Sequence, residues 1–397
     1  MTDESRKVEF RREVEENLRR NILPYWMERM TDPEGGFYGR RDGNDTLHPE
    51  APRGAILNAR ILWAFSAAYR VLGDPAYLET ATRAKREIID RFYDPVYGGV
   101  YWSIQPDGTP LDTKKQFYAM GFAIYGLSEY ARATGDKEAL EYAIRLFRDI
   151  EAHSRDREKG GYIEALTRDW QPIADMRLSD KDANASKTMN THLHIIEPYT
   201  NLLRVWPDPE LREATESLLR VFLDIIGSPD YRGHLGLFFD NSWHRSDLVI
   251  SYGHDIEASW LLLETALVLG DEKLLQRTLD ATRRIADAAL EGLCTDGSMV
   301  YERHGDGHYD NDKHWWVQAE AVVGQLWQYR YHQRPEMLPR AIRTWEYIRD
   351  NLVDPNGEWY WSRRNGEVNR EDDKAGFWKC PYHNSRMALE VIERLSE

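Results

Sequence analysis

Gly99-Val100-Tyr101-Trp102, which follows the turn residues Asp94-Pro95, is one copy of a run that recurs six times in the chain. Each copy is a glycine followed by a short, mostly aromatic and strand-like segment. The copies begin at Gly36, Gly99, Gly161, Gly236, Gly297 and Gly357, which are 63, 62, 75, 61 and 60 residues apart. Self-similarity at a nearly fixed period indicates a repeat architecture. This repeat therefore decides the fold.

Between these runs the apolar residues follow helical rather than alternating spacing. We expect twelve helices, at about 6–29, 54–72, 76–92, 114–134, 137–153, 186–205, 209–227, 251–269, 272–290, 313–332, 335–353 and 374–396. Short polar links such as Gly73-Asp74-Pro75, Gly135-Asp136 and Gly270-Asp271 join an even-numbered helix to the next odd-numbered one. Links this short are typical of αα-hairpins. One long irregular insertion remains, at about 165–185.

The two kinds of helix differ in composition. Odd-numbered helices carry a charged stripe, as in residues 140–148, whereas even-numbered ones are apolar around most of their circumference, as in residues 260–267. A helix apolar on most sides is buried, and one with a charged stripe lies outside it. We therefore predict an all-α fold: an (α/α)6 barrel of six inner and six outer helices, with short β-hairpin-like loops at one end and one domain over residues 1–397. An open solenoid is the alternative, but six near-equal units without capping repeats favour closure.

Composition narrows the function classes. The formal net charge of −15 argues against a general affinity for nucleic acid phosphates or anionic lipid. The sequence has neither an apolar leader nor an 18-residue apolar run, and its two cysteines, Cys294 and Cys380, are far apart. A cytoplasmic location is the expectation from these features. Fourteen tryptophans and twenty-two tyrosines suit the faces and hydroxyl rims of sugars, although packing alone can also use them.

Unusual polar and aromatic residues gather near the starts of the even-numbered helices. In a barrel with parallel inner helices, all six starts converge on one end, so these residues predict a polar, aromatic-rimmed funnel. The residues are Asn58, Arg60, Gln116, Tyr118, Asn190, His192, His194, His254, Glu257, His314, Trp315, Trp316, Gln318, Glu320, Trp378, His383 and Asn384.

The histidines are the strongest functional signal in this set. His194 follows Asn190 by four residues and shares its helix face, whereas His192 points elsewhere. A lone helical histidine is more often a buried structural group than a catalyst. His254 and Glu257 are three residues apart and could form a simple buried hydrogen bond. Three histidines near one barrel end, together with an arginine and two glutamates, nevertheless favour a functional site.

Three other chemistries compete with acid–base catalysis by histidine. The pairs His194/Glu197 and His254/Glu257 have helical spacing but match no recognisable metal motif, so we expect no metal. A glycoside hydrolase needs two opposed carboxylates, and Glu257 and Glu320 are the best candidates. A non-catalytic sugar-binding module is the third alternative. Clustered histidines fit proton transfer near neutral pH better than any of these.

Four segments together resemble the cellobiose 2-epimerase family, which lies within the N-acylglucosamine 2-epimerase superfamily. They are Met189-Asn190-Thr191-His192-Leu193-His194-Ile195-Ile196-Glu197-Pro198-Tyr199-Thr200, Gly253-His254-Asp255-Ile256-Glu257, Asp312-Lys313-His314-Trp315-Trp316-Val317-Gln318-Ala319-Glu320 and Trp378-Lys379-Cys380-Pro381-Tyr382-His383-Asn384, with Arg60 as a lone earlier match. Glu197-Pro198 departs from the family pattern, in which alanine follows the glutamate. That departure affects only the local helix geometry.

The resemblance implies an (α/α)6 barrel, no cofactor, and inversion at C2 of the reducing-end sugar of β-1,4-linked disaccharides such as cellobiose and lactose. Related proteins epimerise free mannose or interconvert aldoses and ketoses, and these activities are the alternatives. We expect a small-molecule sugar as the partner, no nucleic acid or membrane, and a monomer or weak homodimer.

The resemblance also suggests a role for each site residue. His254 and His383 are the implied general acid/base pair, and His194 is the third catalytic histidine. The residues expected to bind substrate are Arg60, Tyr118, Asn190, Glu257, Trp316, Glu320 and Trp378. Among these, Arg60 and Asn190 would help His194 to hold O1 and O2 and to stabilise an enediolate. Glu257 would orient His254 or bind a hydroxyl, the two tryptophans would stack on sugar rings, and Tyr118 would complete the wall.

Overall fold

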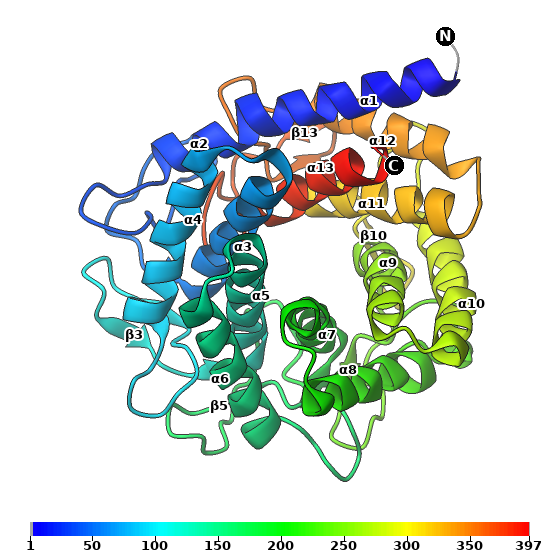
Figure 1. Cartoon of the computed structure of the whole chain (residues 1–397). Coiled ribbons are helices and arrows are strands. Elements are labelled where there is room, and N and C mark those ends of the chain that lie inside the picture. Colours follow the sequence, from blue (N-terminus) through cyan, green and yellow to red (C-terminus); the bar gives the residue numbers. More distant parts are fainter. Residues whose placement is uncertain (1–2, 397) are drawn as a thin grey trace.

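The computed structural model describes residues 3–396, whose helices form an inner and an outer ring (Figure 1). The inner helices are α3 (Ala55–Leu72), α5 (Phe117–Thr134), α7 (Met189–Val205), α9 (Tyr252–Leu269), α11 (Trp315–Tyr331) and α13 (Tyr382–Arg394). The outer positions are filled by α1 (Asp3–Asn17), η1 (Leu18–Ile22) and α2 (Leu23–Arg29), then by α4 (Pro75–Glu87) with η2 (Ile88–Phe92), α6 (Lys137–His153), α8 (Pro209–Val221) with η3 (Phe222–Ile226), α10 (Glu272–Ala289) with η5 (Leu290–Gly292), and α12 (Met337–Asn351).

The inner ring is closed. Each inner helix packs against the next one in chain order, and α13 packs against α3. The predicted all-α (α/α)6 barrel is confirmed, and the open solenoid is wrong. The inner helices are buried along most of their length, as their apolar composition predicted. Within residues 3–396 no helix combines the length and apolarity needed to cross a lipid bilayer.

The predicted hairpin links are present between inner and outer helices. After α3, α5 and α9 the chain turns on a glycine with a φ between +67° and +76°, a conformation that costs glycine little. The next residue is an aspartate whose carboxylate accepts a backbone N–H in the first turn of the outer helix. Each Gly-Asp pair therefore ends one helix and starts the next within two residues.

Short strands lie at the end of the barrel where the inner helices begin. They are β1 (Arg53–Gly54), β2 (Ser103–Ile104), β3 (Pro110–Asp112), β4 (Lys115–Gln116), β5 (Ala165–Leu166), β6 (Lys187–Thr188), β7 (Phe238–Phe239), β8 (Ile250–Ser251), β9 (Glu302–Arg303), β10 (Tyr309–Asp310), β11 (Lys313–His314), β12 (Ser362–Arg364) and β13 (Glu367–Val368). A short 3-10 turn, η4 (Pro229–Tyr231), lies between η3 and β7.

These strands tie each repeat to the next. The strand just before an inner helix pairs antiparallel with the strand of the following repeat, in the pairs β1–β2, β4–β5, β6–β7, β8–β9 and β11–β12. The sixth link is a bridge between Arg41 and Ala375, in which the Arg41 N–H donates to the Ala375 carbonyl at 2.7 Å. That bridge joins the last repeat to the first and completes the circle.

The predicted start of the last helix, at residue 374, is wrong. The helix α13 begins at Tyr382, and the chain before it is irregular and takes part in the Arg41–Ala375 bridge. Pro381 immediately precedes the helix, where its missing N–H costs nothing. The other helix boundaries, including the end of α13 at Arg394, agree with the predicted ranges to within about three residues.

Glu358 connects the last repeat to the first helices through hydrogen bonds of its carboxylate. It is buried, and its φ of +61° matches the left-handed conformation of Gly36, Gly99 and Gly161 at the corresponding turns. Its carboxylate accepts hydrogen bonds from Lys379 Nζ at 2.7 Å, Asn384 Nδ2 at 2.6 Å and Trp26 Nε1 at 2.5 Å. A glycine at this turn would relieve backbone strain but would leave the buried ammonium of Lys379 unpaired.

We expect Glu358→Ala to lower the free energy of unfolding by about 3 kcal/mol, because a broken buried ion pair leaves an uncompensated charge. Chemical denaturation monitored by circular dichroism measures this change. The control is Glu367→Ala, which removes an exposed glutamate of the same repeat. Equal free energies of unfolding for the two variants would contradict the conclusion that Glu358 stabilises the closed ring.

Candidate active site

One cavity of about 830 Å³ opens at the end of the barrel where the inner helices begin. This is the predicted funnel, and the volume lies in the range of small-molecule sites. All but one of the residues predicted to form the site line this cavity. The lining residues from that set are Arg60, Tyr118, Asn190, His194, His254, Glu257, Trp316, Trp378 and His383.

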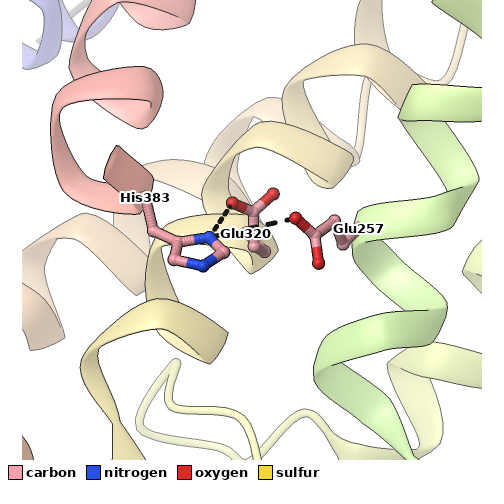
Figure 2. Close-up of side chains that lie close together, drawn as sticks. All are labelled: Glu257, Glu320 and His383. Atoms are coloured by element: carbon pink, nitrogen blue, oxygen red, sulfur yellow. Dashed lines mark hydrogen bonds and ion pairs between the residues drawn. The ribbon is translucent and has the colours of Figure 1, made fainter. Parts of the chain in front are cut away.

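His383 is held by a carboxylate of the neighbouring helix. Its Nδ1 donates to Glu320 Oε1 at 2.7 Å, and Glu257 Oε1 lies 3.9 Å from the same nitrogen (Figure 2). Since Nδ1 carries the proton, the free electron pair is on Nε2, for which no protein partner is recorded among residues 3–396. The His383 imidazole therefore presents a basic nitrogen to the cavity.

Glu320 lies behind His383 rather than on the cavity wall. Its Oε1 accepts from His383 Nδ1 and from Arg386 Nη2, and its Oε2 accepts from Trp260 Nε1 at 3.0 Å. Three protein donors are bonded to this carboxylate, and Glu320 is not among the residues that line the cavity. Its geometry is that of a positioning residue for His383, not of the substrate-binding residue that the sequence suggested.

The other two histidines are held at the same ring nitrogen. His194 Nδ1 lies 2.9 Å from Glu197 Oε2, and His254 Nδ1 lies 2.8 Å from the Ser251 hydroxyl. The idea that Glu257 orients His254 is wrong, because Ser251 fills that position. All three imidazoles thus share one arrangement, with Nδ1 fixed by the protein and Nε2 left for a ligand.

Burial keeps these imidazoles uncharged near neutral pH. Desolvation lowers the pKa of His254 and of His383 to about 3, and it lowers the pKa of His194 well below its ordinary value. The positive charges of Arg60 and Arg386 act in the same direction on His194 and His383. A neutral imidazole can accept a proton, so each ring is poised as a base.

Arg60 places a permanent cation beside these rings. Its Nη2 donates to the Tyr118 hydroxyl at 2.8 Å, and its guanidinium lies 4.1 Å from the centre of the Phe122 ring. Tyr118 in turn packs edge-on against His194, with ring centres 5.1 Å apart. Arg60 is therefore held near His194 by aromatic side chains rather than by a carboxylate, and its charge is available to an anionic ligand.

The two tryptophans predicted to stack on sugar lie on different sides of the histidines. The Trp316 ring centre is 4.8 Å from that of His254 and 5.6 Å from that of His383. Trp378 packs edge-on against Tyr118 at 6.1 Å, in the irregular segment before α13. The polar groups and the apolar platforms thus alternate around one chamber.

His192, which the helix geometry separated from His194, is a structural residue. Its Nε2 accepts the Tyr162 N–H at 2.9 Å, and its Nδ1 donates to the Thr188 carbonyl at 2.6 Å. A side chain at Gly161 would strike this ring, with a Cβ only 2.6 Å from Nε2. Both ring nitrogens are used within the fold, so His192 has no free group for chemistry.

Arg386 is the functional residue that the sequence reasoning missed. Its guanidinium is buried and donates to three carboxylates, those of Glu197, Glu257 and Glu320, and the two latter bonds are both 2.6 Å long. The signal was available, because Arg386 follows His383 by three residues on the same face of an inner helix. Arg386 joins the carboxylate that holds His194 to the one that holds His383.

Glu257, Glu320 and His383 are close enough together for a metal ion to be considered (Figure 2). The Arg386 guanidinium already donates to both carboxylates, and the His383 Nδ1–H is directed at Glu320. A metal ion would have to displace a positive charge that is built into the fold. The donor set is therefore complete with the arginine, and we assign no metal ligands here.

The insertion predicted at 165–185 covers one side of the cavity. Its residues 176–183 and Ala185 line the chamber. The Gln116 side-chain amide holds this segment by donating to the carbonyls of Met176 and Arg177 at 3.1 and 2.9 Å. Asn184 joins the two arms of the segment by bonding to Met176 and Ala174. The wall facing the histidines is thus a loop whose sequence differs from the repeats.

The sequence pattern of N-acylglucosamine 2-epimerase (GlcNAc 2-epimerase) matches residues 36–386. The chain belongs to this family. It is 59% identical to the cellobiose 2-epimerase of Bacteroides fragilis over 386 residues, which cover 96% of this chain and 98% of the relative. The family resemblance seen in the sequence is confirmed, and the chain is accordingly a sugar epimerase.

Solved structures of the family agree with the fold. The cellobiose 2-epimerase of Spirochaeta thermophila DSM 6192 superposes with a TM-score of 0.92 at 41% identity, covering 98% of this chain and 97% of that one. The cellobiose 2-epimerase of Bacillus thermoamylovorans B4167 gives a TM-score of 0.91 at 39% identity, covering 97% and 99%. The same ring therefore carries family members whose sequences differ at more than half of the positions.

We expect Arg386→Met to lower the free energy of unfolding by about 3–5 kcal/mol at pH 8, because it leaves three buried carboxylates without their cation. Burial raises the pKa of Glu320, but Arg386 and His383 together lower it to about 2. Arg386 also opposes the raised pKa values of Glu197 and Glu257, so its loss raises the pKa values of all three carboxyl groups in the folded state. The folded variant then binds more protons than the unfolded chain, so its stability rises as the pH falls.

The deficit relative to the unsubstituted protein should therefore be smaller at pH 5 than at pH 8, as measured by denaturant titration at both pH values. Arg20→Met is the control, since Arg20 is exposed and its one ion pair among residues 3–396 is with Glu16. Its effect should stay below about 1 kcal/mol at both pH values. A deficit of the same size at pH 5 and pH 8 for Arg386→Met would show that its charge is not what matters.

Proposed function

We propose that this epimerase inverts C2 of the reducing-end aldose of β-1,4-linked disaccharides, converting cellobiose to glucosyl-mannose and lactose to epilactose. The observation that carries the proposal is the set of three imidazoles, each fixed at Nδ1 and each presenting Nε2 to one chamber. The names of the relatives, which are cellobiose 2-epimerases, support the choice of substrate. The chamber volume of about 830 Å³ accommodates a disaccharide.

The chemistry needs the sugar ring to open, because only an aldehyde makes the neighbouring C2–H acidic. One imidazole then removes the C2 proton and becomes an imidazolium, while the electron pair moves to O1 and forms an enediolate. A proton must then return to the opposite face of C2. Either the first imidazolium gives its proton back after the enediolate has rotated about a C–C bond, or the second imidazole takes a proton from water and donates it while the first releases its own to water. His254 and His383 suit these two roles because they flank Trp316 on different helices.

The negative charge that develops on O1 and O2 needs a preorganised cation and hydrogen-bond donors. Arg60 supplies the charge, and His194 and Asn190 supply polar groups on one face of α7. Trp316 and Trp378 are the stacking platforms, and Tyr118 closes the wall beside Arg60. Glu320 and Ser251 hold the two acid–base histidines in place.

A glycoside hydrolase is disfavoured by the carboxylate geometry. Hydrolysis needs two carboxyl groups that face the scissile bond from opposite sides. Glu257 and Glu320, the best candidates, instead converge on a single nitrogen of Arg386, and Glu320 does not reach the cavity.

We expect incubation with cellobiose or lactose to yield a disaccharide with mannose at its reducing end, identified by NMR. Separate incubations with glucose and mannose test monosaccharide activity. Free glucose released from cellobiose would favour hydrolysis, and a product with a reducing-end ketose would favour aldose–ketose isomerisation. Unchanged sugars in all four incubations would contradict the proposed function.

In heavy water the enzyme should place deuterium at C2 of its substrate. We expect His254→Asn and His383→Asn to reduce this exchange by at least about 100-fold, the lower end of typical acid–base contributions. His244→Asn is the control, because His244 is 81% exposed and lies outside the cavity. Exchange at the unsubstituted rate in either of the first two variants would remove that histidine from the mechanism.

A further inference from the structure

The carboxylates around Arg386 outnumber their cation. Glu197 on α7, Glu257 on α9 and Glu320 on α11 all accept hydrogen bonds from this one guanidinium of α13. All three are buried, and the imidazoles beside them are neutral. Three ionised carboxylates would leave excess negative charge in a low-dielectric site, and buried like charges are resolved by binding protons.

The number of polar partners of each carboxyl group shows which of the three is least stabilised in its charged form. Glu320 accepts from His383, Arg386 and Trp260, and Glu197 is bonded to His194, Arg386 and Tyr382. Each of these two groups therefore has three polar partners.

Glu257 has one donor. Its Oε1 accepts from Arg386 at 2.6 Å, whereas its Oε2 is buried and has no hydrogen-bond partner in the described structure. A carboxylate with few donors is the least stabilised in its charged form. The proton that this cluster needs is therefore best placed on Glu257.

We propose that Glu257 is a neutral carboxylic acid in the working enzyme and that it donates a hydrogen bond from Oε2 to an oxygen of the bound sugar. Glu257 lines the cavity three residues after His254, whereas its Oε2 is buried behind the cavity surface, so the hydrogen bond to a sugar requires a rotation of the Glu257 side chain. The role in sugar binding rests on the proposed function, whereas the protonation state rests on the charge cluster alone.

The surroundings of Glu257 act together on its titration. Burial is the largest cause that raises the pKa of Glu257 well above its ordinary value, followed by the negative charge of Glu320, and Arg386 opposes both. Glu197 adds to the increase, and the uncharged groups near Glu257 are Tyr118, Tyr382, His194, His254 and His383.

A neutral Glu257 serves the proposed reaction in a way that an anion cannot. The enediolate is negative, and an ionised carboxylate on the chamber wall would repel it. A carboxylic acid removes this repulsion and adds a donor at a position where the fold has no other use for the oxygen. The ionised Glu320 lies off the cavity lining, and its charge is paired with Arg386.

Infrared difference spectroscopy tests the protonation without any substrate. The spectrum of the unsubstituted enzyme minus that of Glu257→Gln at pH 8 should contain the carbonyl stretch of one un-ionised carboxyl group. The control is Glu367→Gln, which removes an exposed glutamate and should show only the loss of an ionised carboxylate. A Glu257 difference spectrum with only carboxylate bands would overturn the proposal. Thermal unfolding of each variant confirms that it is folded.

Activity tests the hydrogen bond. Glutamine keeps an N–H donor at this position and leucine does not, so kcat/KM of Glu257→Gln should exceed that of Glu257→Leu by at least about tenfold, the value of one hydrogen bond to a buried partner. The alkaline loss of activity that follows ionisation of Glu257 should also be absent in Glu257→Gln. Equal kcat/KM for the two variants would overturn the donor role. An unsubstituted enzyme that epimerises no sugar would refute the proposed function, and the infrared result would still decide the protonation state.

Discussion

The parallel direction of the six inner helices is the constraint on which the site depends. Because every inner helix begins at the same end of a closed ring, side chains from the first turns of six repeats converge on one chamber although they lie far apart in the sequence. The two-residue strand pairs fix where each helix begins. A change in the entry angle of one helix would move its catalytic side chain relative to the other five.

Much of this arrangement could be predicted from the sequence, because it follows from periodic features. The glycine-aromatic runs marked the repeats, helical spacing marked the helices, and the Gly-Asp links marked the hairpins. The start of α13 could not be placed from apolar spacing alone, because residues 374–381 form a bridge to Arg41, more than 300 residues earlier. A contact between distant segments leaves no local period.

The site residues divide in the same way into those that the sequence predicted and those whose contacts depend on the fold. Residues that project from the first turns of the inner helices were found, since they are polar groups on otherwise apolar helices. The pairings of those residues were not predicted: Ser251 holds His254, and Glu320, which was expected to bind substrate, holds His383 from behind. Arg386 was missed because an arginine near the end of a chain is usually exposed, and only the ring brings three glutamates of other helices around it. Pairings across a barrel are set by topology, which spacing does not encode.

The Arg41–Ala375 bridge and the packing of α13 against α3 also determine at which point of synthesis the ring can close. Chains emerge from the ribosome with the earlier segments first. His383 and Arg386 lie on the helix that follows all the others, so a nascent chain that already contains Arg60, His194 and His254 still has an open ring and three glutamates without a counter-ion. Partial products of translation therefore hold most of the sugar-facing surface but none of the closed, dry environment. Any reaction step that needs His383 therefore requires the closed ring.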